Sequence, residues 1–110
     1  MAIEYIGEGK IFNGVVTSNG SVHTSDEVKV YNPNRRVGNT SVNLYSTKAG
    51  TATIEVKMEQ GTTWYVLTSG ITIPATTLVS TVLTQLVYAV RVVYTNGATA
   101  GVLNGWIYSA

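Results

Sequence analysis

Between residues 52 and 59 apolar and polar side chains alternate without a slip, in the order Ala-Thr-Ile-Glu-Val-Lys-Met-Glu. Side chains repeat every two residues in a β-strand and every 3.6 residues in an α-helix, so this alternation predicts a half-buried antiparallel strand. Its core-facing residues are expected to be Ala52, Ile54, Val56 and Met58. Gly61 lies near the turn that follows, and residues 63–68 are predicted to form the second strand of a hairpin.

Further runs rich in β-branched residues, each bounded by Gly, Asn or Pro, predict the other strands. These runs cover residues 11–18, 28–31, 42–45, 71–73, 78–83, 86–94 and 101–108. About eight or nine strands at a spacing of about 8 to 12 residues indicate an all-β fold, namely a single antiparallel β-sandwich or a flattened, jelly-roll-like barrel. One domain is expected to span residues 1–110. Residues 1–10 form either an N-terminal arm that reaches a neighbour or an ordinary first strand at residues 3–6.

The strand at residues 86–94 is apolar on both faces. We expect the face that carries its tyrosines to be the core, and the predicted core then includes Ile54, Val56, Trp64, Val90 and Val92. The opposite face carries Val87, Ala89, Arg91 and Val93, an apolar strip that a subunit interface would cover. A homo-oligomer follows, most simply a cyclic trimer in which Arg91 pairs with an acid across the interface or lies at its rim.

Composition and charge exclude several classes of function. The chain has no cysteine, which rules out disulfides, thiolate nucleophiles and thiolate metal sites. Seven Lys and Arg against six Asp and Glu are too balanced to predict a nucleic-acid or anionic-membrane partner. The stretch at residues 71–93 is interrupted by Pro74 and Arg91, so no transmembrane segment is expected, and the first residues do not resemble a secretory signal. Arg35 and Arg36 form one compact basic feature, which is either a solvated turn or a contact to an acidic partner surface or to phosphates.

Neither catalysis nor a metal site is expected. His23 is the only histidine, and although Asp26 and Glu27 follow it, the spacing matches no known metal motif. No Gly-X-Ser-X-Gly segment is present to support a Ser-His-Asp triad. Glu55 and Glu59 would lie roughly 13 Å apart along one strand, too far for a retaining glycosidase pair, and are expected to be solvated. We therefore predict a chain without enzymatic activity, cofactor or metal.

The two tryptophans raise a carbohydrate-binding alternative, because flat aromatic side chains can stack on apolar faces. Trp64 alternates with Val66, and Trp106 alternates with Tyr108, which favours a core position for both tryptophans. Asn104 and Trp106 share a strand face and form the candidate glycan platform.

Three segments carry a resemblance to a known class of proteins: residues 50–57 (Gly-Thr-Ala-Thr-Ile-Glu-Val-Lys), residues 63–67 (Thr-Trp-Tyr-Val-Leu) and residues 89–94 (Ala-Val-Arg-Val-Val-Tyr). This pattern of strands resembles small β-sandwich structural proteins of tailed bacteriophages, over about residues 42–108. Members of that group decorate capsids or serve as head and tail accessories.

The resemblance implies a non-enzymatic virion protein, made in the host cytoplasm, that acts as a capsid decoration or cement protein on the outer surface of the head. It implies a trimer bound to the major capsid protein, with Arg35, Arg36 and the N-terminal residues facing that support. The alternative is a carbohydrate-binding module or attachment protein of a phage tail or fibre.

Overall fold

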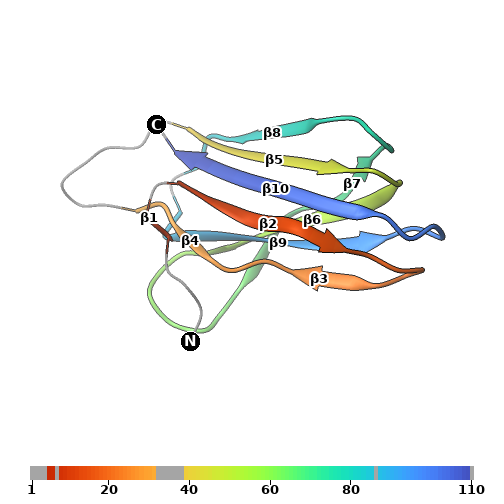
Figure 1. Ribbon diagram of the computed structural model, residues 1–110. Coiled ribbons are helices and arrows are strands. Elements are labelled where there is room, and N and C mark those ends of the chain that lie inside the picture. The colour runs from red at the N-terminus through yellow and green to blue at the C-terminus, as the bar shows by residue number, and fades with distance from the viewer. Residues whose placement is uncertain (1–4, 7, 32–38, 86, 110) are drawn as a thin grey trace.

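The computed structural model describes residues 5–6, 8–31, 39–85 and 87–109. These residues form ten strands and no helix, arranged as two sheets that pack face to face (Figure 1). The strands are β1 (Tyr5–Ile6), β2 (Glu8–Val16), β3 (Val22–Thr24), β4 (Val28–Lys29), β5 (Thr40–Ser46), β6 (Gly50–Lys57), β7 (Tyr65–Ile73), β8 (Val79–Leu83), β9 (Ala89–Asn96) and β10 (Val102–Ser109). The all-β prediction is confirmed, and of its two architectures the sandwich is the one found.

One sheet has four strands in the order β2-β10-β5-β8, all antiparallel. The other has the order β1-β4-β9-β6-β7, and β3 also pairs with β9. In Figure 1 the four-stranded sheet forms the upper layer, with β10 between β2 and β5. Residues Tyr5 and Ile6 pair with β4 of the same chain, while residues 1–4 and 7 lie outside the described part.

β3 and β4 follow one another along β9, and a serine bridges the gap between them. Thr24 pairs with Val93, and Val28 pairs with Val90. Between them the amide of Ser25 donates to the Val92 carbonyl, and the Val92 amide donates to Ser25 Oγ, both at 2.9 Å. A side-chain oxygen thus replaces the missing backbone acceptor, so the hydrogen bonding of β9 continues without an orphan donor.

The core lies between the sheets and consists of alternate residues from the paired strands. Ile54, Val56, Val90 and Val92 are all buried there, as predicted. Tyr94 is also fully buried, and its hydroxyl lies 3.2 Å from both Ser46 Oγ and Asn96 Oδ1. The phenol end covers Gly50, where even a Cβ atom would collide with it.

The hairpin of β6 and β7 is present, but its second strand is longer than predicted. A break was expected at residues 69–70, whereas β7 continues through them. Ala52 pairs with Ile71 and Ile54 with Thr68, so two residues of β7 stand opposite one residue of β6. This is a β-bulge, and Gly70 takes the positive φ of 68° that it requires. β7 ends at Ile73, directly before Pro74, as expected.

Two core predictions in the hairpin are wrong. β6 ends at Lys57, so Met58 no longer follows the strand alternation and is 58% exposed. Trp64 is only half-buried and lies outside the core, because it packs over Lys57 and Arg91 on the outer side of the six-stranded sheet. Strand alternation cannot predict such positions, because residues 58–64 lie between β6 and β7.

Candidate functional site

The outer face of the four-stranded sheet carries a row of polar and aromatic side chains. Trp106 of β10 pairs with Lys10 of β2 on one side and with Asn43 of β5 on the other. Asn43 in turn pairs with Ser80 of β8. Directly paired residues point to the same side of a sheet, so these four side chains cross the whole outer face.

Two further rows flank this one. Tyr108, Ser41 and Val82 are paired across β10, β5 and β8, and Asn104 is paired with Tyr45. Tyr108 is 48% exposed and Val82 is 57% exposed. We call the nine residues of the three rows the amide–aromatic face: Lys10, Ser41, Asn43, Tyr45, Ser80, Val82, Asn104, Trp106 and Tyr108. Lys10 is the charged member of this set, and Glu8, which pairs with Tyr108, continues the third row on the same edge strand, β2.

Internal hydrogen bonds hold the amides of this face. Asn43 Oδ1 accepts from Ser80 Oγ at 2.5 Å, and Asn43 Nδ2 donates to Ser41 Oγ at 2.9 Å. Asn104 Oδ1 accepts from the amide of Gly14 at 2.9 Å. These contacts use the oxygens of both amides and so fix the side chains against the sheet.

Asn104 and Trp106 share this outer face, as their spacing predicted, and both are half-buried. The core position that the alternation favoured for Trp106 is therefore wrong. The Lys10 ammonium lies 5.4 Å from the centre of the Trp106 ring, a cation–π distance that occupies part of the ring. The sequence analysis missed Asn43, Tyr45 and Tyr108. The alternation of polar and buried apolar residues over residues 41–45 is the signal that could have placed the first two there.

The outer face of the six-stranded sheet does not carry the predicted apolar strip. Ala89 is fully buried and Val87 is 7% exposed within the single chain. Ala89 pairs with Lys57 and Lys29, whose long stems can cover so small a neighbour. Ala89 thus faces the outer side, as expected, but it and Val87 are covered within the chain and leave no exposed apolar strip there. Val93 does lie on this outer face, half-buried between its paired neighbours.

Arg91 is paired within the chain. Its Nε donates to Glu55 Oε1 at 2.7 Å, and Glu55 is its direct partner on β6. Its guanidinium also lies over Trp64. Arg91 therefore pairs with an acid on the neighbouring strand of the same chain, and not with an acid across a subunit interface. Glu55 was expected to be freely solvated, but it forms this salt bridge with Arg91. The other two interface candidates, Arg35 and Arg36, lie outside the described residues.

The cluster around the histidine is divided between two sides of the sheet. His23 pairs with the core residue Tyr94, and its Nε2 lies 2.8 Å from Ser21 Oγ. Glu27 instead forms a salt bridge with Lys57 at 3.1 Å, on the outer side. Within the described part of the chain, no group of three His, Asp or Glu side chains is placed to hold a metal ion. The same part contains no helix with the length and apolarity needed to cross a bilayer.

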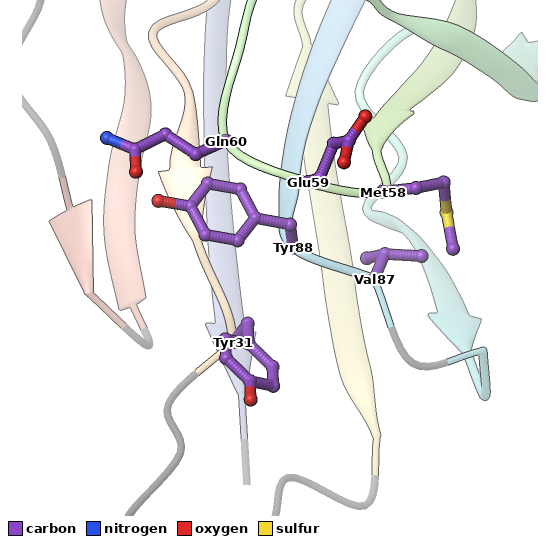
Figure 2. Close-up of a pocket in the computed structure, with 6 residues that line it drawn as sticks. All are labelled: Tyr31, Met58, Glu59, Gln60, Val87 and Tyr88. Atoms are coloured by element: carbon purple, nitrogen blue, oxygen red, sulfur yellow. The ribbon is translucent and has the colours of Figure 1, made fainter.

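A pocket of about 380 Å³ lies on the six-stranded sheet, where β4 ends and β9 begins (Figure 2). It is lined by Tyr31, Met58, Glu59, Gln60, Val87 and Tyr88. The Tyr31 and Tyr88 rings lie 6.4 Å apart with a tilt of 32°. The Tyr31 amide donates to the Tyr88 carbonyl at 3.1 Å, and the Tyr88 amide donates to the Lys57 carbonyl at 2.8 Å. These bonds tie the three segments that form the pocket. No sequence pattern marks this pocket, because its residues come from three separate segments of the chain.

No protein-family model and no curated protein matches the sequence. Among solved structures, the chain is similar to the crystal structure of PBSX exported protein XepA, with a TM-score of 0.74 and 12% sequence identity. The match covers 94% of this chain and 36% of the XepA chain, so this chain corresponds to about a third of that protein. At this identity the similarity establishes a shared fold.

Proposed function

We propose that the chain is a non-enzymatic structural protein of a phage particle that binds another virion protein through the amide–aromatic face. The shared fold connects it to an exported protein of the phage PBSX. The observation that carries the proposal is the chemistry of the face, which combines Tyr45, Trp106 and Tyr108 and carries its charges, Lys10 and Glu8, on the edge strand β2. The cores of protein interfaces are depleted in charge and enriched in Tyr and Trp.

The internal hydrogen bonds favour a protein partner over a sugar at this face. A sugar ring needs amide groups that are available to its hydroxyls, but the side-chain oxygens of Asn43 and Asn104 already accept from Ser80 and Gly14. A face whose amide oxygens already accept hydrogen bonds and whose aromatic rings remain partly exposed is suited to burial against another protein surface.

The placement on the particle comes from the resemblance to phage decoration proteins, which implies the outer surface of the head and the major capsid protein as partner. A homotrimer is part of this proposal. The absence of enzymatic activity is also part of this proposal, and two of the acidic residues, Glu27 and Glu55, form salt bridges with Lys57 and Arg91.

The test is co-sedimentation of the purified protein with empty capsids of the encoding phage, using two aspartate variants. Val82 is 57% exposed on β8, and Val66 is 60% exposed on β7, so both are accessible valines on edge strands. We expect Val82→Asp to abolish capsid binding, because it puts an unpaired charge into the interface, and Val66→Asp to bind like wild type. Equal binding by the two variants, or no binding by the wild type, would refute the proposal.

The oligomeric state is measured separately by sedimentation velocity. A trimer at high micromolar concentration, or on the capsid, is expected. If the wild-type chain remains monomeric under both conditions, the homotrimer is refuted. The proposal for the docking face is tested separately by the two aspartate variants.

A further inference from the structure

We infer that the pocket in Figure 2 binds a neutral pyranose sugar. This goes beyond the proposed function, because the pocket belongs to the six-stranded sheet and its ligand is a saccharide, whereas the amide–aromatic face belongs to the four-stranded sheet. The two activities can therefore be separated by substitution.

The aromatic rings supply a platform that exists before binding. Tyr31 is 52% exposed, and its ring lies beside that of Tyr88. The backbone hydrogen bonds from residues 30 and 31 to the Tyr88 carbonyl hold together the two segments that carry these side chains. A pyranose presents an apolar C–H face that packs on such rings, and a preformed platform lowers the entropic cost of binding.

The polar groups of the pocket are available, in contrast to those of the amide–aromatic face. Within the described residues Glu59 and Gln60 form no hydrogen bond or salt bridge, and both side chains are exposed. Figure 2 shows the Tyr88 ring between Gln60 and Tyr31, whereas the Glu59 carboxylate points to the other side, toward Met58. An amide both donates and accepts, so the Gln60 side chain complements sugar hydroxyls beside the Tyr88 ring.

The charges around the pocket favour a neutral ligand. The Lys29 ammonium lies 5.3 Å from the centre of the Tyr88 ring, so a cationic ligand would meet a like charge. Because Lys29 occupies part of the Tyr88 ring, the sugar packs mainly on the more exposed Tyr31 ring. An acidic sugar would meet the Glu59 carboxylate. The volume of about 380 Å³ lies near the lower end of ligand pockets, which suits one or two sugar rings.

The experiment is a titration of the ¹⁵N-labelled full chain followed by amide chemical shifts. The probes are methyl glucoside, methyl galactoside, methyl mannoside and N-acetylglucosamine, with glucosamine and glucuronate as charged comparisons. At least one neutral sugar is expected to shift the amides of Gln60 and Tyr88 in a saturable manner, with weaker effects from the charged sugars.

Four variants locate the binding. Tyr31→Ala and Gln60→Ala should each weaken it about tenfold, since each removes a stacking or hydrogen-bonding contact. Tyr65→Ala is the matched control for Tyr31→Ala, because Tyr65 is 55% exposed and lies on β7, outside the pocket lining. Trp106→Ala tests the sheet face that the sequence analysis proposed as a glycan platform.

Loss of binding in both pocket variants, with Tyr65→Ala and Trp106→Ala unchanged, supports the inference. It is overturned if no neutral sugar shifts the spectrum, if binding survives both pocket variants, or if only Trp106→Ala abolishes it. The amide spectrum of each variant reports its fold. Capsid binding by Gln60→Ala is expected to equal that of wild type, so failure of the sugar site and failure of the docking face give different results.

Discussion

The guanidinium of Arg91 lies 4.3 Å from the centre of the Trp64 ring, on the outer side of the six-stranded sheet. The Lys57 ammonium lies 4.9 Å from the same ring, and each cation also forms a salt bridge, Arg91 with Glu55 and Lys57 with Glu27. A single tryptophan thus joins two ion pairs on this outer face. The apolar strip predicted there is replaced by a network internal to the chain.

Replacing Trp64 by alanine should cost about 1–2 kcal/mol of unfolding free energy, from two cation–π contacts of about 0.5–1 kcal/mol each. A fully buried tryptophan would cost about 3–5 kcal/mol. Urea unfolding monitored by circular dichroism measures the difference. Ile54→Ala serves as the core comparison and should lose more, about 2–5 kcal/mol, because Ile54 is fully buried. A Trp64→Ala loss as large as that of Ile54→Ala would contradict the half-buried position.

Gly50→Ala should destabilise the protein by about 1–3 kcal/mol, the usual cost of adding atoms to a packed site. The new methyl group would meet the Tyr94 phenol end and the Thr95 carbonyl. Because the phenol oxygen is the nearest of these atoms, the penalty should be smaller in a Tyr94→Phe background. Thermal unfolding of the two single variants and the double variant gives the coupling energy, and strictly additive losses would show that the two residues do not interact.

Ser25→Ala should cost about 1–3 kcal/mol, because it leaves the amide of Val92 without an acceptor in a buried strand. The serine oxygen that it removes now accepts from that amide at 2.9 Å. Hydrogen exchange at Val92 should accelerate relative to wild type. Ser69→Ala, on the exposed bulge of β7, is the comparison and should leave Val92 exchange unchanged.

Val93→Asp should change neither the sedimentation coefficient nor capsid binding. The sequence alone predicted that Val93 belongs to an apolar interface strip, but its paired neighbours are Thr24 and Thr53, and Ala89 is covered within the chain. Sedimentation velocity of the variant beside wild type measures this. If the wild type is an oligomer and the Val93→Asp variant is a monomer, the outer face of β9 is the subunit interface after all.

The period of two along residues 52–56 and 90–94 was sufficient to predict the fold class and the core positions Ile54, Val56, Val90 and Val92. It also placed Asn104 and Trp106 on one side of their strand. Pro74 correctly marked the end of β7, because it has no amide to donate. These features depend only on residues that are close in the sequence, and the geometry of the strand backbone determines the relative direction of their side chains.

Other positions depend on contacts between distant segments, which no local pattern encodes. Trp64 lies on the outer sheet face because Lys57 and Arg91 come together there from two strands. The rows of the amide–aromatic face follow from the register of β2, β10, β5 and β8, and the sugar pocket requires residue 31, residues 58–60 and residues 87–88 to meet. Strand alternation determined which side of its own strand each residue faces, and only the tertiary pairing of strands decided which residues lie beside it.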